Sequence, residues 1–201
     1  MEGKVMLDEV KIERIKKEAR ENHVPILQDD SLQFIETLLE IKKPASILEV
    51  GTAVGYSALN FSKHLKNGGK IITMELNEET ANVAKENIKE LKMENVIQVV
   101  NTDAYEHMKT LNETFDVVFI DAAKGQYMKY LAEALRLTKS GSIIIADNVL
   151  LRGMVMGDYN EHKHRTAVKR LREYIAAITE NPNLVSCVMD VGDGVAVSVV
   201  K

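Results

Sequence analysis

The sequence predicts an α/β fold in which a mostly parallel β-sheet carries helices on both faces and ends in an antiparallel hairpin. Apolar strand-like runs alternate with amphipathic helical segments through the central part of the chain. Two of these runs, Phe115–Asp121 and Ser142–Asp147, are apolar almost throughout, as expected for strands buried on both sides. The last two β-rich runs, Leu184–Val191 and Val195–Val200, are joined by Gly-Asp-Gly. This link is too short for a helical crossover, so these strands should be antiparallel.

The chain begins with two predicted helices. Residues 5–22 are dense in charge, with Met6, Val10, Ile15 and Ala19 as sparse apolar points of a helix. Its basic residues are interleaved with glutamates, which favours a solvated face over contact with nucleic acid. Pro25 ends this helix because the residue before a proline is forced out of the helical region. Residues 31–41 form a second, amphipathic helix, and Pro44 ends it before the first strand.

The central elements begin with a strand over residues 47–50 and a helix that starts near Tyr56. We expect one domain over residues 1–201, with residues 1–44 as an N-terminal helical cap and residues 45–201 as the core. The pattern then predicts further strands and helices, in order, at Lys70–Glu75, Glu78–Leu91, Val96–Asn101, Ala104–Leu111, Phe115–Asp121, Tyr127–Leu137, Ser142–Asp147 and Thr166–Ile178.

The composition is that of an ordinary soluble globular protein, with 45% hydrophobic and 28% charged residues. The net charge of −4 argues against a chain that is basic throughout, although a local basic face could still bind nucleic acid. The single cysteine, Cys187, excludes an intramolecular disulfide, and we expect it in the core of its strand. Neither a signal peptide nor an apolar run of roughly 20 residues is present. We therefore expect a cytoplasmic protein with no membrane partner.

A small-residue turn follows the first strand, with the spacing E-x-G-x-x-x-G from Glu49 through Gly51 to Gly55. Glycine permits backbone angles closed to other residues and leaves room for a ligand against the main chain. The spacing differs from the dinucleotide fingerprint and from the phosphate-binding loop. Strand, glycine loop and helix thus form either a ligand-binding loop or a tight turn with no ligand.

Acidic residues recur where the predicted strands end. Glu75 closes the second strand, where a carboxylate can accept both hydroxyls of a ribose or simply remain solvated. Asp103 and Ala104 stand where the third strand passes into a helix, so Asp103 can be a helix cap or a ligand-binding residue.

A second polar set follows the two most apolar strands. Because the carboxyl ends of adjacent parallel strands meet at one edge of a sheet, Asp121, Asp147 and Asn148 should lie together. Two carboxylates and an amide oxygen suit Mg²⁺ or Mn²⁺, although each residue alone could be a turn former. Lys124 stands three positions after Asp121. It could be a general base, a positive charge beside an oxyanion, or an ordinary surface lysine.

Three motifs, EVGTAVGYSAL, FIDAAKGQY and ADNVLLRG, together resemble those of class I S-adenosylmethionine-dependent, metal-dependent O-methyltransferases of the catechol and caffeoyl-CoA type. The resemblance implies a Rossmann-like sheet of about seven strands, an enzyme, and S-adenosylmethionine with Mg²⁺ or Mn²⁺ as cofactors. It also implies a homodimer. By motif position it assigns cofactor binding to Glu49, Gly51, Gly55, Ser57, Glu75, Asp103, Ala104 and Asp121, metal binding to Asp121, Asp147 and Asn148, and catalysis to Lys124 and Asp121.

Within that family the chain is most similar to bacterial enzymes that methylate 5-hydroxyuridine at the wobble position of tRNA. The alternative acceptor is a small catechol-like or caffeoyl-CoA-like metabolite. Residues 162–172 carry five lysines and arginines and no acid, just after the loop 150–160 that should border the site. Such a strip can track a phosphate backbone or be a solvated helix face. A nicotinamide dehydrogenase is disfavoured by the glycine spacing, and a non-catalytic RNA-binding module by the intact polar set.

Overall fold

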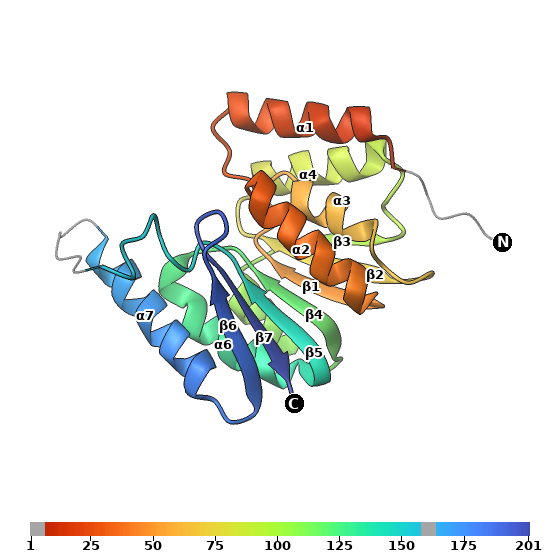
Figure 1. Cartoon of the computed structure of the whole chain (residues 1–201). Coiled ribbons are helices and arrows are strands. Elements are labelled where there is room, and N and C mark those ends of the chain that lie inside the picture. Colours follow the sequence, from red (N-terminus) through yellow and green to blue (C-terminus); the bar gives the residue numbers. More distant parts are fainter. Residues whose placement is uncertain (1–6, 158–163) are drawn as a thin grey trace. The chain divides into compact units, whose positions relative to one another are not determined.

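The computed structural model describes residues 7–157 and 164–201. It contains two compact units, Met1–Ala104 and Tyr105–Lys201. The described part of the first unit holds four helices and three strands (Figure 1). In chain order these are α1 (Glu9–Glu21), α2 (Asp29–Lys42), β1 (Ser46–Val50), α3 (Tyr56–Ser62), β2 (Lys70–Glu75), α4 (Glu78–Glu90) and β3 (Ile97–Asn101).

The three strands of the first unit form a parallel β3-β2-β1 arrangement. Leu48 pairs with Ile72 between β1 and β2, and Ile72 pairs with Gln98 between β2 and β3. Helices α3 and α4 pack on β2 and β3, while α1 and α2 both contact α3. The crossover helices therefore cover strands whose apolar side chains are buried, as the alternating pattern predicts.

Local signals in the sequence set the ends of the first two helices. Asp8 caps α1 by accepting hydrogen bonds from the main-chain N–H groups of Val10 and Lys11. The buried face of α1 carries Ile15 as predicted, whereas Val10 is exposed. Residues 5 and 6 of the predicted helix, including Met6, lie outside the described residues. Helix α2 ends where Lys43, just before a proline, turns left-handed at φ 51°.

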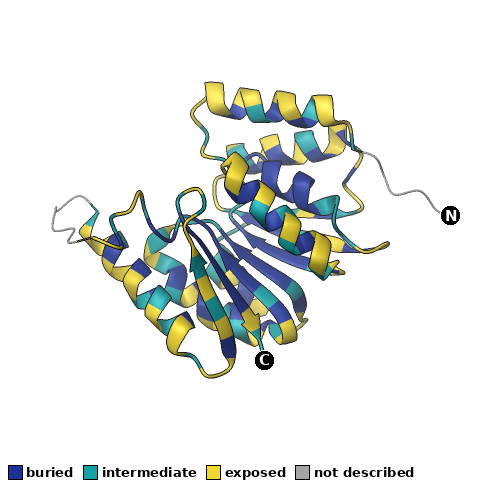
Figure 2. Cartoon of the chain, in the orientation of Figure 1, coloured by how far each residue is buried: buried dark blue, intermediate teal, exposed yellow. Residues whose placement is uncertain are grey.

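In the second unit, strands β4 (Phe115–Ile120) and β7 (Val195–Val200) are buried over most of their length (Figure 2). Helix α5 (Ala104–Thr110) starts at the last residue of the first unit. The other described elements of the second unit are the short 3₁₀ helix η1 (Lys124–Gln126), α6 (Tyr127–Arg136), β5 (Thr138–Ala146), α7 (Arg165–Glu180) and β6 (Leu184–Met189). Strands β4 and β5 are parallel, and every residue from Val117 to Ile120 in β4 is buried. Helix α6 packs on β4 and β5, and α7 packs on β6.

The C-terminal hairpin is antiparallel, as predicted. Strand β7 pairs with β6 on one side and with β5 on the other, both antiparallel. Strand β6 lies at the edge and shows alternating burial, because helix α7 covers only one of its faces. Cys187 points to the exposed face, so the prediction that it belongs to the core is wrong. The predicted fold class, α/β with seven mostly parallel strands and an antiparallel end, is confirmed.

Candidate active site

The glycine loop after β1 is held tightly by its neighbours within the first unit. Gly51, Ala53 and Gly55 all take positive φ angles of 101°, 46° and 84°. The main-chain N–H of Gly51 donates to the carbonyl oxygen of Met74 in β2 at 3.0 Å. A Cβ at Gly55 would meet only ordinary contacts at 3.5 Å, so the backbone angle and not lack of room favours glycine there. The loop is a hydrogen-bonded turn between a strand and a helix, with three of its residues at positive φ.

Two of the predicted cofactor residues contact each other behind this loop. The Ser57 hydroxyl donates to Oε1 of Glu49 at 2.5 Å, and both side chains are buried. Glu49 extends from β1 and Ser57 from the first turn of α3, so their bond joins the two elements that flank the loop. A hydrogen bond to a buried carboxylate is among the stronger kinds, and it stiffens the loop.

Glu75 at the end of β2 also belongs to the loop. Its Oε2 accepts from the main-chain N–H of Ala53 at 3.0 Å, and its Oε1 accepts from that of Asn77 at 3.0 Å. An ionised carboxylate has about four acceptor positions, so roughly two remain for hydroxyl donors of a ligand. Asp103 and Ala104 lie at the passage from β3 to α5, as predicted.

In the second unit, the predicted catalytic and metal-binding residues gather around Nζ of Lys124. This nitrogen lies 2.9 Å from Oδ1 of Asp121 and 2.9 Å from Oδ1 of Asn148. Asp121 follows β4 and Asn148 follows β5, so the parallel pairing of the two strands brings their ends together. Asp147 is buried, and its Oδ2 accepts from Nδ2 of Asn148 at 2.9 Å. These residues therefore lie together, as the sequence predicts.

Tyr127 is a further member of this cluster, beyond the residues predicted from the sequence. Its hydroxyl accepts from Nζ of Lys124 at 2.8 Å and donates to the carbonyl oxygen of Asp147 at 2.8 Å. Burial raises the pKa of Tyr127 well above its ordinary value, and the nearby charges of Asp121 and Asp147 raise it further. The side chain therefore stays protonated. The sequence does contain one indication of this contact. Tyr127 stands three positions after Lys124, and a buried tyrosine usually has a hydrogen-bond partner for its hydroxyl.

The oxygens of Asp121 and Asn148 already bind one positively charged group, Nζ of Lys124, between them. Carboxylate and amide oxygens are the donors that Mg²⁺ and Mn²⁺ prefer. No group of three His, Cys, Asp or Glu that could hold a metal occurs within residues 7–157 and 164–201, so a metal here would need the amide of Asn148 as a ligand. The donor set fits a hard divalent cation.

The turn that follows Asn148 is braced by the C-terminal hairpin. Asn148, Leu151 and Arg152 take positive φ angles of 55°, 46° and 55°. The main-chain N–H of Leu150 donates to the carbonyl oxygen of Asp193 at 3.0 Å, and that of Arg152 donates to the Asp193 carboxylate. The hairpin link predicted from its glycines therefore also fixes the turn beside the predicted metal ligands.

The predicted basic strip lies only partly on described residues. His162 and Lys163 fall outside them, as do residues 158–160 of the predicted loop. On α7, Lys169 and Arg170 both form ion pairs with Glu173. Arg172 donates from Nε to the carbonyl oxygen of Val155 at 2.9 Å. Half of the basic side chains on α7 thus form ion pairs with an acidic residue, and Arg172 donates a hydrogen bond to a main-chain carbonyl oxygen.

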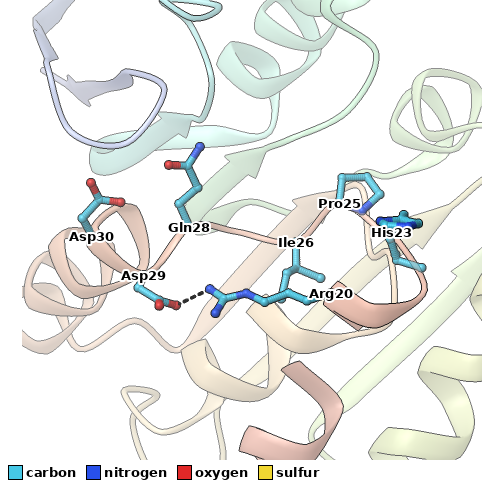
Figure 3. A pocket seen from close by; sticks show the side chains of 8 residues that line it. Arg20, His23, Pro25, Ile26, Gln28, Asp29 and Asp30 are labelled. Atoms are coloured by element: carbon cyan, nitrogen blue, oxygen red, sulfur yellow. Dashed lines mark hydrogen bonds and ion pairs between the residues drawn. The ribbon is translucent and has the colours of Figure 1, made fainter. Parts of the chain in front are cut away.

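A shallow pocket lies elsewhere in the first unit, at the connection between α1 and α2 (Figure 3). None of the predicted site residues lines it. Arg20 and Asp29 face each other at its wall, with Nη2 of Arg20 3.0 Å from Oδ1 of Asp29. A hydrogen bond from Lys16 lowers the pKa of Asp29, which keeps the carboxylate charged. Arg20 and Asp29 therefore pair with each other at this wall, and the carboxylate of Asp30 lines the pocket as well.

Comparison with known proteins decides the family. Residues 2–201 match the family model described as O-methyltransferase. The chain belongs to the O-methyltransferase family. It is 33% identical over 178 residues to a catechol O-methyltransferase of Niastella koreensis, covering 84% of this chain and 79% of that protein. It is 28% identical over 176 residues to caffeoyl-CoA O-methyltransferase 2 of Populus trichocarpa, covering 83% and 71%.

Solved structures of O-methyltransferases share the fold over nearly the whole chain. The Bacillus cereus enzyme, solved in complex with SAH, is 27% identical with a TM-score of 0.85, covering 98% of this O-methyltransferase and 93% of that chain. TomG from Streptomyces achromogenes, solved in complex with SAM, is 25% identical with a TM-score of 0.85, covering 98% and 92%. The family and the enzyme class predicted from the three motifs are confirmed. No helix in the described part of the chain is long and apolar enough to cross a membrane.

Proposed function

We propose that this O-methyltransferase transfers the methyl group of S-adenosylmethionine to a hydroxyl of a small catechol-like or caffeoyl-CoA-like aromatic compound, with Mg²⁺ or Mn²⁺ bound. The observation that carries the proposal is the convergence of Asp121 and Asn148 on one positively charged group at the ends of two adjacent strands. The similarity to catechol and caffeoyl-CoA O-methyltransferases supports the choice of acceptor.

The first unit supplies the residues for the methyl donor. Glu75 has acceptor capacity left for ribose hydroxyls after binding Ala53 and Asn77. The side chains of Thr52 and Val54 in the turn from Gly51 to Gly55 are buried, so the main chain at the two glycines is a surface against which a ligand can lie. Asp103 and Ala104 would border the adenine.

The second unit supplies the residues for the acceptor. Asp121, Asp147 and Asn148 would hold the divalent ion, which when bound lowers the pKa of an acceptor hydroxyl and orients it. Lys124 would act at the acceptor oxygen, either by taking its proton after losing its own beside the metal or by placing positive charge beside it. In the net reaction the oxygen bonds to the methyl carbon as the carbon–sulfur bond breaks. The electron pair of that bond remains on sulfur, and the hydroxyl proton passes to a base, either the neutral amine of Lys124 or water.

Methylation of 5-hydroxyuridine in tRNA is the second candidate. Its 5-hydroxyl and 4-oxo groups offer two neighbouring oxygens, as a catechol does. The observation in favour is that Arg165 and Lys169, one turn apart on α7, are both exposed and could contact phosphates. Ion pairs of Lys169 and Arg170 with Glu173, and the bond from Arg172 to the main chain, weaken this second candidate. A homodimer and a cytoplasmic location also stay predictions.

The deciding experiment measures transfer of labelled methyl from S-adenosylmethionine to catechol, caffeoyl-CoA and tRNA containing 5-hydroxyuridine, each with Mg²⁺ and with a chelator. We expect metal-dependent labelling of a small aromatic acceptor, and loss of at least about 100-fold in Asp147→Ala. Asp190→Ala, at an exposed position just after β6, is the control and should keep full activity. Full transfer by Asp147→Ala in the presence of the chelator would refute the metal site.

If only the tRNA is labelled, the acceptor is RNA and not a small aromatic compound. In that case the double variant Arg165→Gln/Lys169→Gln should lose RNA methylation, and the loss should shrink as salt is raised. The same variant should leave transfer to a small aromatic acceptor unchanged if the acceptor is a metabolite.

A further inference from the structure

Tyr127 is the first residue of α6 and is completely buried. Its hydroxyl oxygen accepts from Nζ of Lys124 at 2.8 Å, and its proton is directed to the carbonyl oxygen of Asp147 at 2.8 Å. The carbonyl oxygen of Ile120 lies farther away, at 3.4 Å. A tyrosine hydroxyl has one proton to donate, so the shorter of these contacts takes it.

The two hydrogen bonds of 2.8 Å connect Lys124, the proposed catalytic residue, with the main chain next to Asn148, a proposed metal ligand. The Asp147 carbonyl belongs to the peptide that leads into Asn148, and Asn148 takes a left-handed φ of 55° that non-glycine residues seldom adopt. A fixed peptide plane at this point sets the direction in which the Asn148 side chain leaves the strand. Nζ of Lys124, held by the same hydroxyl, then lies 2.9 Å from the Oδ1 of Asn148.

We propose that Tyr127 is a positioning residue for methyl transfer, whose hydroxyl fixes Nζ of Lys124 relative to the peptide that precedes Asn148. The inference rests on the proposed function, because it assigns Tyr127 a role through Lys124. A tyrosine that served only as a packing residue could be replaced by phenylalanine without loss. The hydroxyl is therefore the atom to test.

The fold offers a matched control in Tyr174 of α7. The rings of Tyr127 and Tyr174 pack edge to face, with their centroids 5.5 Å apart. Tyr174 is also fully buried, and its hydroxyl has no hydrogen-bond partner among the residues that the structure describes. Tyr174→Phe thus removes a buried hydroxyl from the same aromatic pair without touching Lys124 or Asp147.

The first measurement compares steady-state methyl transfer by the full chain, Tyr127→Phe and Tyr174→Phe. We expect Tyr127→Phe to lower kcat by about 10- to 100-fold, the scale of a small misplacement of catalytic groups, with KM for S-adenosylmethionine within about twofold. Tyr174→Phe should keep both constants. Equal kcat in the two variants, or a rise in KM for S-adenosylmethionine that matches the fall in kcat, would overturn the proposal, because the hydroxyl would then be structural only.

The second measurement is a double-mutant cycle on urea unfolding in the presence of a chelator, with Tyr127→Phe, Lys124→Met and the double variant. A hydrogen bond between Tyr127 and a charged partner predicts that the two single changes are non-additive by at least about tenfold in the unfolding equilibrium constant. Additive effects would overturn the proposal. If the unaltered chain methylates none of the acceptors, the proposed function fails, and this cycle still decides whether Tyr127 holds Lys124.

Discussion

Nζ of Lys124 lies 2.9 Å from Oδ1 of Asn148, although 24 positions separate the two residues. The same nitrogen lies 2.9 Å from Oδ1 of Asp121. Both oxygens are proposed ligands of the divalent ion. Lys124 and the ion therefore share acceptors, and binding of the ion has to weaken the hold of these oxygens on Lys124.

This sharing predicts that Lys124→Met abolishes methyl transfer and yet tightens metal binding. We expect the dissociation constant for Mn²⁺, measured by calorimetry, to fall by about fivefold or more because a competing charge is removed from the ligand oxygens.

Lys129→Met is the control for this metal-binding measurement, because Nζ of Lys129 lies over the Tyr105 ring, 5.1 Å from its centroid. It removes the same charge away from the shared oxygens. High salt screens a remote charge but not direct competition, so the effect of Lys124→Met should survive about 0.5 M KCl. Equal affinities of the two variants would contradict the shared-ligand interpretation.

Glu75 links the glycine loop to the predicted ribose site, which makes Glu75→Gln a specific test of cofactor binding. The amide replaces one carboxylate oxygen with a donor, so it can no longer accept from both Ala53 and Asn77 and also from two ribose hydroxyls. We expect calorimetry to give about 10- to 100-fold weaker binding of S-adenosylhomocysteine, from the loss of one or two charge-assisted hydrogen bonds. Glu79→Gln, on the exposed first turn of α4, should bind normally.

Gly194 in the hairpin link is predicted to tolerate no side chain. Its φ is 88°, and a Cβ there would lie 2.8 Å from the main-chain nitrogen of Leu150 and would collide with the Leu150 side chain. We expect Gly194→Ala to lower the free energy of unfolding by about 2–4 kcal/mol, from backbone strain plus overpacking. Gly141→Ala has a similar φ of 81° and nothing within 4 Å, so it should lose only about 1–2 kcal/mol. Equal losses in urea unfolding would show that the Leu150 contact does not matter.

Much of the fold could be predicted because local signals agree with the tertiary structure. The predicted strands Lys70–Glu75 and Val195–Val200 have the bounds of β2 and β7, since apolar runs there are closed by charged or glycine residues. The proximity of Asp121 and Asp147 could be predicted because the carboxyl ends of adjacent parallel strands lie at the same edge of a sheet.

Other features depend on contacts that no local pattern records. The collision between a side chain at Gly194 and Leu150 joins residues far apart in the sequence. The exposure of Cys187 arises because β6 is an edge strand covered on one face only, which its apolar composition could not reveal. The hydrogen bond of the Tyr127 hydroxyl could not be predicted either, because it depends on where the carbonyl oxygen of Asp147 lies in the folded chain.

His64 gives the first unit a pH-dependent contribution to stability. Its Nδ1 lies 2.9 Å from Glu40 and its Nε2 lies 3.3 Å from Glu36, both on α2. The hydrogen bond to Glu36, supported by Glu40, raises the pKa of His64 above its ordinary value of 6.5. The folded protein therefore binds the proton more tightly than the unfolded chain. The stabilisation is fully present below the unfolded pKa and is lost as pH rises through the raised folded pKa.

We therefore predict that His64→Gln lowers the free energy of unfolding by about 1 kcal/mol near pH 6 and by much less near pH 9. Urea unfolding of both proteins across this range measures the difference. Glu36→Gln is the matched control, because it removes the larger cause of the raised pKa and leaves the imidazole in place. It should flatten most of the pH dependence. A difference between the unaltered chain and His64→Gln that stays constant from pH 6 to pH 9 would mean that His64 acts through packing and not through its charge.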